Sequence, residues 1–508
     1  MGESRTKNVK RNMVYGLINK IIILGFPFVI RTIILYKLGA EYLGLSSLFS
    51  SILQVLNMAE LGFSSAITFN LYKPMAENDT DKICALMALY RKIYKIIGIG
   101  ILVIGTAIIP LLPRLIKGEC PSDINIYLLY LIYLANTSIS YLFFAYKNVL
   151  LTASQRQDVL NNIDTVLVII RSIIQISLLC IVSNYYVYII WNPIITLINN
   201  LAVAYITNKR FPNYVCRGKL DRDEIRSIVQ LVEGSAIGKI GLVARNSFDS
   251  IILSAFLGLV DVAIYSNYFY ILNAVGSMTS TTIQSITASV GNSIATESVE
   301  KNYYDFKRLN FYYNWICSWC TICMLCLYQP FMKIWAGVDL CADFITVILF
   351  CVYFYIGQIG QIRAAYATAS GIWWEFRYLQ IGEMIGNFSL NLLFGYFWGM
   401  KGIILATIIT VFIFSFVGTG KKTINIYFQK GAKEYFVNCV IYSIATILGA
   451  ALTYTICLFV HGSDFMVLLL RMAICCVVPN AFFLIVAAKS EIYRSYMAQF
   501  VNVIKIKK

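Results

Sequence analysis

Charged side chains interrupt several long apolar stretches of the sequence, and they recur at helical spacing. In residues 228–256, Arg245 precedes Asp249 by four positions, which places both side chains on one face of a helix, where they can pair. In an earlier apolar stretch, Lys20 and Arg31 also share a helical face. Arg binds phosphate and carboxylate groups through paired, charge-assisted hydrogen bonds. These residues therefore indicate recognition of an anion, and Asp249 adds a group that can take up a cation or a proton.

Other apolar stretches carry ionisable residues in similar arrangements. Asp164 and Arg171 lie seven positions apart, and Glu383 shares a helical face with Asn387. For Asp164 and Arg171, two interpretations stay open: a structural pair, or a role in a cavity. For Lys20, the alternative to a role in a cavity is that its long side chain reaches the cytoplasmic surface of a membrane. The candidates for binding an anionic substrate are Arg31, Arg245, Lys20 and Arg171. The candidates for ion coupling are Asp249, Glu60, Asp164 and Glu383.

The stretches that hold these residues are long enough to cross a membrane. The chain has 508 residues, of which 59% are hydrophobic and 13% charged, and its mean hydropathy is +0.70. A soluble domain has roughly 45–50% apolar and about 25% charged residues, so this composition does not fit one. A transmembrane helix needs about 20 apolar residues. Fourteen such spans are predicted, at residues 12–36, 44–70, 93–112, 126–146, 159–182, 186–206, 228–256, 262–290, 310–332, 344–368, 378–400, 402–419, 436–460 and 466–488.

The distribution of basic residues predicts the orientation of these spans. With the N-terminus in the cytoplasm, 30 of the 42 Lys and Arg residues fall in cytoplasmic segments, 5 in outside loops and 7 within spans. Cytoplasmic loops of membrane proteins carry such an excess of Lys and Arg, so both termini are expected in the cytoplasm. The net charge of +16 then reflects membrane insertion and contact with anionic lipid. Nucleic acid is therefore not an expected partner. The first span is too long for a cleavable signal, and we expect it to be retained.

The sequence contains no catalytic or metal-binding motif. Cys317, Cys320 and Cys323 are spaced three apart, but Cys within a span usually acts as a small hydrophobic residue. The single histidine, His461, lies on a predicted outside loop, and the longest such loop, at 113–125, has thirteen residues. We therefore expect no cofactor, no metal and no enzymatic activity.

The two halves of the chain resemble each other. Residues 32–53 align with residues 250–272 after a slip of one residue, so that Gly39 matches Gly258. The offset covers six predicted spans, and an even number of crossings predicts a parallel repeat about an axis along the membrane normal. The expected fold is all-α, with two pseudo-symmetric six-helix lobes followed by two helices. The predicted parts are an N-terminal lobe at 1–207, a cytoplasmic linker at 208–227, a second lobe at 228–434, and two final helices with a basic tail at 435–508.

Several short motifs occur in a fixed order along the chain. They are KNVKRNMVYG (7–16), LGAEYLGL (38–45), ELGFSSA (60–66), LLTASQRQ (150–157), FDSIIL (248–253), FLG (256–258) and IYSNY (264–268). Through these motifs, about the first 300 residues resemble bacterial polysaccharide flippases of the multidrug/oligosaccharidyl-lipid/polysaccharide (MOP) exporter superfamily, the Wzx-type O-antigen transporters. Further along the chain, the resemblance is one of hydropathy.

This resemblance implies a MATE-like fold of about fourteen helices in the bacterial cytoplasmic membrane. It implies movement of an undecaprenyl-diphosphate-linked oligosaccharide to the outer leaflet, for assembly of lipopolysaccharide O-antigen, capsule or exopolysaccharide. Alternating access would be the mechanism, often with coupling to H⁺ or Na⁺, and a polysaccharide polymerase and glycosyltransferases would be partners. We expect a monomer in contact with membrane lipid.

Two other functions stay open. A MATE-like exporter of small molecules or drugs would share the fold, but cationic drugs favour an acidic cavity, and the seven Lys and Arg residues within spans outnumber the five acidic residues there. A membrane polysaccharide polymerase or glycosyltransferase is the more distant alternative, because such enzymes usually carry catalytic carboxylates on a sizeable outer loop.

The charge distribution gives a testable prediction of topology. Reporter fusions at Asn208 and at Lys508 should both report a cytoplasmic location, because the positive-inside bias places both positions inside. A fusion within 113–125 is the matched control and should report an external location. An external signal at Asn208 or Lys508 would contradict the fourteen-span topology and the parallel repeat together.

Overall fold

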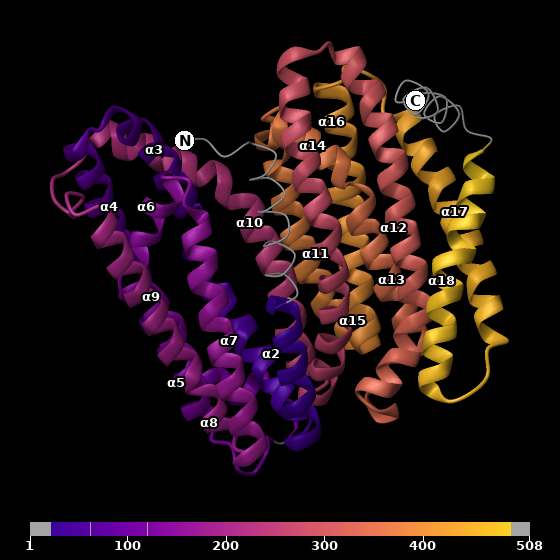
Figure 1. Cartoon of the computed structure of the whole chain (residues 1–508). Coiled ribbons are helices and arrows are strands. Elements are labelled where there is room, and N and C mark those ends of the chain that lie inside the picture. The colour runs from indigo at the N-terminus through magenta and orange to yellow at the C-terminus, as the bar shows by residue number, and fades with distance from the viewer. Residues whose placement is uncertain (1–21, 61, 119, 489–508) are drawn as a thin grey trace, which may run out of the picture. The chain divides into compact units, whose positions relative to one another are not determined.

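The computed structural model describes residues 22–60, 62–118 and 120–488, and its regular elements in these ranges are all helical (Figure 1). Contacts between the helices divide the chain into two compact units, of which unit 1 ends at Ala263 and unit 2 begins at Ile264. The predicted all-α class is confirmed.

Unit 1 contains a helix at residues 22–37 followed by a series of long and short helices. These are α2 (Ala40–Leu56), η1 (Asn57–Glu60), α3 (Phe63–Glu77), α4 (Thr80–Ile108), η2 (Ile109–Leu115), α5 (Ile126–Leu142), η3 (Ala145–Lys147), α6 (Asn148–Ala153), α7 (Gln157–Ile181), α8 (Tyr185–Ile189), α9 (Trp191–Arg210) and α10 (Arg222–Phe256). Helix α4 packs on α5, α5 on α9, and α9 on α7, while α10 packs on α2 and α3.

Buried aromatic rings anchor the apolar cores of unit 1. The ring of Phe49 on α2 packs edge-on against Tyr130 and Tyr133 of α5. A second core joins α3, α4 and α6 around Tyr90 and Tyr146. Edge-to-face pairs of this kind add to the free energy gained from burying the rings, and they hold α2 in place against α5.

Two glycines that align in the sequence repeat occupy equivalent helix breaks. Gly39 has a φ of 121° and directly precedes α2, and Gly258 has a φ of 108° and directly precedes α11 (Leu259–Thr296). Residues with a side chain rarely adopt such values, whereas glycine does so readily. The same break at aligned positions supports the repeat seen in the sequence.

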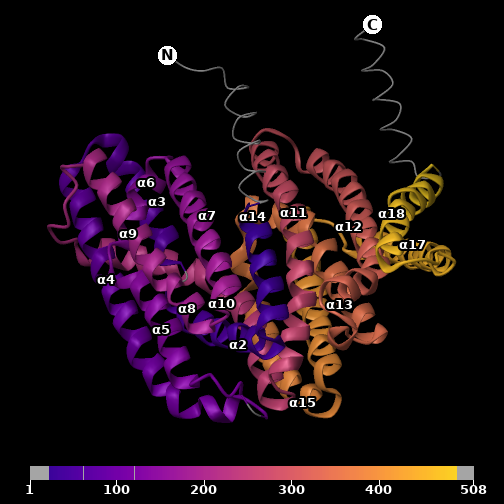
Figure 2. The ribbon, with the colours of Figure 1, turned by 60° about the horizontal axis from the view of Figure 1, so that its bottom comes forward.

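Unit 2 is formed by most of α11 and the helices that follow it. These are α12 (Val299–Trp335), η4 (Val338–Leu340), α13 (Phe344–Ile359), α14 (Gln361–Ala369), η5 (Ile372–Phe376), α15 (Arg377–Thr410), the π-helix η6 (Val411–Gly418), α16 (Thr419–Ile426), α17 (Lys433–Leu458) and α18 (Asp464–Ala487). Helix α12 packs against α13, α17 and α18. Figure 2 shows α17 and α18 side by side next to α12.

A sharp kink divides α15 into two arms. Gly399 has φ 57° and ψ −135°, a conformation that breaks the helix and turns the chain back. A Cβ atom on Gly402 would lie 2.0 Å from the carbonyl oxygen of Phe394. The absence of a side chain at Gly402 therefore lets the two arms approach closely, and the two predicted spans in this region form one tight hairpin.

Side-chain caps explain where several helices begin. Asn125 accepts hydrogen bonds from the first backbone N–H groups of α5, and Ser298 does the same for α12. Asp221 and Glu224 form a capping box at the start of α10. Lys82 lies 2.7 Å from Glu224, and its hydrogen bond lowers the pKa of that carboxyl group. This ion pair joins the start of α10 to the start of α4.

Helices cover the described part of each of the fourteen predicted spans. Within the described residues, nine helices are long and apolar enough to cross a membrane, or ten when the bent pair Ile126–Leu142 and Ala145–Ala153 counts as one span. The number is lower than fourteen partly because the continuous segment Trp374–Ile426 contains two predicted spans, 378–400 and 402–419. In addition, α10 and α11 are rich in polar residues, and the first span is described only in part.

The contact-based units do not follow the predicted lobes residue by residue. The sequence places the start of the second lobe at 228, whereas α10 makes its contacts with α2 and α3 and belongs to unit 1. A lobe defined by an internal repeat and a unit defined by contacts describe different properties. The boundaries at 1–207, 208–227, 228–434 and 435–508 therefore stay predictions.

A glycine in the motif LGAEYLGL gives a testable prediction about packing. A Cβ atom on Gly44 would lie 2.1 Å from the carbonyl oxygen of Leu259, so Gly44→Ala forces backbone to move. We expect a loss of at least about 2 kcal/mol in stability, measured as a lower melting temperature of the purified protein. Gly100→Ala on α4 is the matched control, because no atom lies within 4 Å of its Cβ position. Equal melting temperatures for the two variants would contradict the close approach.

Candidate functional site

Two of the predicted cationic residues meet at one tyrosine in unit 1. Arg31 lies on the helix at 22–37, and Arg171 lies on α7. Both guanidinium groups are close enough to the hydroxyl of Tyr188, on α8, to interact with it electrostatically. Residues 140 positions apart in the sequence are thus brought to one place, which helical spacing alone did not predict.

A network of tyrosine hydroxyls extends from this place. Arg31 also interacts electrostatically with Tyr185, whose hydroxyl lies 2.9 Å from that of Tyr133. The Tyr133 hydroxyl in turn donates a hydrogen bond to Ser46 on α2 at 3.0 Å. Four elements therefore contribute polar groups to one connected network: the first helix, α2, α5 and α8.

An amide network lies one helical turn beyond Arg171. Gln175, which is 2% exposed, donates hydrogen bonds to the side chain of Asn192 at 2.9 Å and to the carbonyl oxygen of Tyr188 at 3.1 Å. Because Gln175 fixes the backbone of Tyr188, it also positions the tyrosine that both arginines approach.

The two networks border a polar cavity inside unit 1. The cavity has a volume of about 230 Å³, and Tyr133 and Asn192 contribute to its wall. Its lining residues are Ser50, Leu53, Asn57, Ile132, Tyr133, Asn136, Thr137, Ile189, Asn192 and Pro193. Since a water molecule takes up about 30 Å³ of liquid volume, the cavity has room for several waters or for a small polar group. A whole oligosaccharide does not fit in it.

The two charged candidates of α10, Arg245 and Asp249, lie in the part of that helix that packs on α2. Asp249 is 3% exposed, and neighbouring Ser247 lies 3.4 Å from the side-chain oxygen of Gln54 on α2. Arg245 lies one turn earlier and is partly buried. Both Arg245 and Asp249 have interaction partners in the structure. Burying a carboxylate costs free energy unless the charge is paired, so we expect Asp249 to have a partner inside the protein.

The carboxylate of Glu60 lies in an aromatic site with a lysine beside it. The Tyr94 hydroxyl donates a hydrogen bond to Glu60 at 3.3 Å, and Tyr90 donates to Tyr94 at 2.7 Å. Lys239 of α10 interacts electrostatically with Glu60 and donates to Ser65 at 3.1 Å. Sequence reasoning did not single out Lys239, although it is one of the seven basic residues within predicted spans.

Asp164 and Arg171 have different neighbours. The carboxylate of Asp164 accepts a hydrogen bond from Asn199 on α9, whereas Arg171 interacts with Tyr188. Lys20, the remaining basic candidate, lies outside the described residues. Of the candidate binding residues, the structure thus brings Arg31 and Arg171 together and places Arg245 on α10.

Glu383, the candidate of unit 2, takes part in a hairpin contact. Its carboxylate accepts a hydrogen bond from the Ser415 hydroxyl at 2.6 Å. Asn387 and Asn391, one and two turns further along the same face, are buried, and Asn387 donates to the Thr407 hydroxyl at 3.0 Å. The polar face predicted from the sequence therefore joins the two arms of the hairpin.

Arg363 is a buried charge that sequence reasoning missed. It is 5% exposed, and it donates hydrogen bonds to the backbone carbonyl oxygens of Phe416 at 2.8 Å and Ser415 at 3.0 Å. Both carbonyls belong to the π-helix η6, and π-helical turns often occur at functional sites. The apolar stretch VFIFSFVG, residues 411–418, gave no sign in the sequence that its backbone would bind an arginine.

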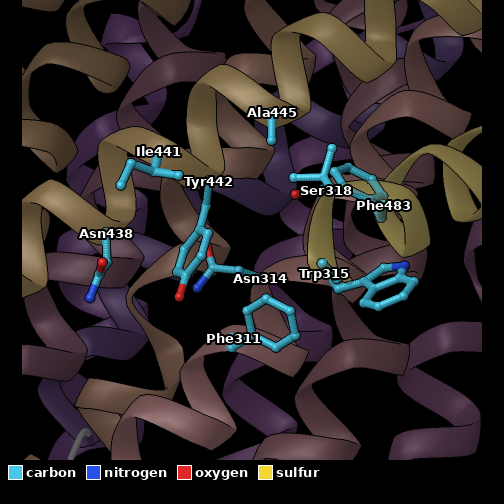
Figure 3. Close-up of a pocket in the computed structure, with 11 residues that line it drawn as sticks. Phe311, Asn314, Trp315, Ser318, Asn438, Ile441, Tyr442, Ala445 and Phe483 are labelled. Carbon is cyan, nitrogen blue, oxygen red and sulfur yellow. The ribbon is translucent and has the colours of Figure 1, made fainter. Parts of the chain in front are cut away.

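A second cavity, of about 300 Å³, lies in unit 2 between α12, α17 and α18 (Figure 3). Figure 3 shows aromatic and amide side chains projecting into it from these helices. None of its lining residues is charged: Phe311, Asn314, Trp315, Ser318, Asn438, Ile441, Tyr442, Ala445, Phe483, Val486 and Ala487. Its lining therefore offers no positive charge to an anion.

The structure is similar to solved structures of membrane transporters. The lipid II flippase MurJ, in an inward closed conformation, is 14% identical with a TM-score of 0.62, and the match covers 94% of this chain and 98% of that one. An inward-facing multidrug resistance MATE family transporter of the MOP superfamily is 14% identical with a TM-score of 0.61, covering 78% and 92%. A mutant of the Vibrio cholerae MATE transporter VcmN is 13% identical with a TM-score of 0.54, covering 84% and 98%.

The chain has the fold of these transporters. Its described part is all-α, with nine or ten helices long and apolar enough to cross a membrane, in the arrangement of the MATE and MurJ folds. No family profile and no curated protein matches the sequence. The finer resemblance to Wzx-type flippases, the substrate and the candidate site residues accordingly stay predictions.

Proposed function

We propose that the protein is a flippase that moves an undecaprenyl-diphosphate-linked oligosaccharide across the bacterial cytoplasmic membrane by alternating access. The observation that carries this proposal is the meeting of Arg31 and Arg171 at Tyr188, beside a polar cavity. Two guanidinium groups match the charge and geometry of a diphosphate. The proposed substrate-binding residues are Arg31, Arg245, Lys20 and Arg171.

In this proposal, different groups of the site bind different parts of the substrate. Tyrosine hydroxyls and the Asn192 amide both donate and accept hydrogen bonds, and such groups suit a sugar next to the diphosphate. The cavity of about 230 Å³ holds only a small part of the cargo, so the remaining glycan must lie outside it. In this proposal both termini are cytoplasmic, the protein acts as a monomer, and a polymerase and glycosyltransferases work on its cargo.

Export of cationic small molecules is the second candidate. Several matched structures are MATE transporters, two of them named for multidrug resistance. Glu60 among Tyr90 and Tyr94 is the kind of acidic aromatic site that binds an organic cation. However, Lys239 interacts with the same carboxylate and offsets its charge. Extrusion of a cationic dye that is lost in Glu60→Gln would favour this function over the flippase.

The arginine site gives a testable prediction. Arg31→Ala or Arg171→Ala should reduce flipping of a lipid-linked oligosaccharide in proteoliposomes roughly tenfold or more, because a hydrogen bond to a charged group contributes about 1.5–3 kcal/mol. Arg→Lys should restore activity in part, because it keeps the charge and loses the fork. Lys421→Ala, at an exposed position on α16, is the control and should flip normally. Full activity in the Arg31→Ala/Arg171→Ala double variant would eliminate the proposal.

We further propose that Asp249 couples transport to an ion gradient. In this proposal, Arg245, one turn away, pairs with the Asp249 carboxylate and then exchanges it for substrate phosphate, which leaves Asp249 without its cation. A buried carboxylate in that position takes up H⁺ or Na⁺ because an unpaired charge there is costly. The other coupling candidates are Glu60, Asp164 and Glu383.

Variants of this pair separate coupling from simple packing. If Asp249 couples, Arg245→Leu/Asp249→Leu should fold but export poorly, and its residual export should not respond to the ion gradient. If the pair only serves insertion, the double variant should export normally, since no buried charge is left unpaired. Export measured with and without an imposed H⁺ or Na⁺ gradient distinguishes the two, and normal gradient-dependent export would place the coupling site elsewhere.

A further inference from the structure

Three cysteine thiols from three helices of unit 2 meet at one point. Cys326 lies on α12, Cys457 on α17 and Cys475 on α18. Their sulfur atoms all lie within 4.8 Å of one another, and the residues are 0%, 0% and 1% exposed. A fourth thiol, Cys323, interacts with the thiol of Cys475. The sequence shows only the short C-x-x-C spacing on α12, because the other two thiols are more than 130 positions away.

The surrounding contacts fix this meeting point. Trp319 on α12 donates a hydrogen bond at 2.8 Å to the backbone carbonyl oxygen of Cys475, which sets the register of α18 against α12. On α17, a Cβ atom at Gly449 would lie 3.3 Å from Ile322 of α12, so the glycine allows close packing of these two helices. The cysteines are therefore held by two interhelical contacts that do not involve sulfur.

The spacing of the thiols fits a metal ion better than a disulfide. With Zn–S bonds of about 2.3 Å, sulfur ligands around one ion lie about 3.8–4.0 Å apart. Sulfur atoms no more than 4.8 Å apart reach that spacing with shifts below about 1 Å. A disulfide requires about 2.05 Å between two sulfurs and leaves the third unused, and the described cysteines are all free thiols.

A positive charge lies beside the thiols. Arg471, one turn before Cys475 on α18, interacts electrostatically with Cys457 and Cys475, and donates to the backbone oxygen of Cys326 at 3.5 Å. Its Nε atom is buried and has no hydrogen-bond partner among the described residues. An arginine within a membrane span needs a compensating group. Zn²⁺ with three thiolates, or Cu⁺ with two, carries one negative charge, which Arg471 neutralises.

We propose that Cys326, Cys457 and Cys475 form a binding site for a soft metal cation, Zn²⁺ or Cu⁺, with Cys323 available as a fourth ligand. Thiolates select these ions over hard cations such as Mg²⁺ or Ca²⁺. The thiols that become ligands release their protons, and no electron transfer is required. The bound ion would tie α17 and α18 to α12, because free energy of metal binding is also free energy of folding. This site is independent of the proposed transport function.

The direct test is the metal content of the full-length protein. The protein is purified under reducing conditions, loaded with Zn²⁺ or Cu⁺ in separate samples, freed of excess ion and analysed by mass spectrometry for metals. We expect the wild type to retain a stoichiometric amount of one ion, and Cys457→Ser and Cys475→Ser to fall to background. Cys320→Ser on α12 and Cys476→Ser on α18 are matched controls on the same helices, and both should retain the ion.

Two further measurements guard against variants that fail to fold. Addition of Co²⁺ to the wild type should produce a thiolate-to-metal charge-transfer absorption, which arises only when sulfur binds the metal directly. This measurement uses the wild type alone, so it does not depend on whether a variant folds. A soft-metal chelator should lower the melting temperature of the wild type and leave that of Cys475→Ser unchanged. The proposal is overturned if the wild type retains neither Zn²⁺ nor Cu⁺, if the Cys→Ser variants retain as much as it does, or if the thiols are found joined in a disulfide.

Discussion

The cost of an unsatisfied polar group in hydrocarbon is the constraint on which the rest of this structure depends. A charged side chain in the middle of a span costs about 2.5–3.5 kcal/mol on insertion scales, and backbone groups at that depth need partners within the protein. The chain satisfies its buried charges in different ways. Arg363 is bound by two backbone carbonyls, whereas Arg31 and Arg171 approach a tyrosine hydroxyl. This difference separates an arginine with a structural role from the arginines that are proposed to bind substrate.

An arginine that binds carbonyls of a π-helix cannot leave them without exposing those oxygens, so Arg363 acts as a structural tie. Its neighbour Ser415 extends the tie, because the same residue gives its carbonyl oxygen to Arg363 and donates its hydroxyl hydrogen to Glu383. Glu383 is thereby a weaker candidate for ion coupling than Asp249. Tyrosine hydroxyls, in contrast, can rotate and exchange partners at little cost. In contrast to Arg363, Arg31 and Arg171 are therefore proposed to turn toward an incoming anion.

The sequence predicted the class of the fold and the helical segments because hydropathy and period act locally. It also predicted that Glu383 and Asn387 share a face, since helical spacing alone decides that. The meeting of Arg31 with Arg171 could not be predicted, because it depends on how the first helix, α7 and α8 pack. Lys239 shows the same limit, since its relation to Glu60 arises from the contact of α10 with η1. Gly39 and Gly258 could be predicted in part. The alignment matched the two glycines, and the structure adds the physical reason, which is the positive φ at both positions.

The cysteines of unit 2 extend this argument to residues that looked inert. Within one helix, Cys323 and Cys326 have no property that separates them from other small apolar residues. Once three helices converge, the relevant quantity is the distance between sulfur atoms on different helices, together with the charge of Arg471 beside them. Arg471 is then not an uncompensated charge within a span, because a thiolate cluster with its bound ion would supply the matching negative charge. The proposed metal site thus gives one reason for both features: the thiolates would bind the ion, and Arg471 would neutralise the charge of the complex. Packing alone explains neither the arginine nor the convergence of the thiols.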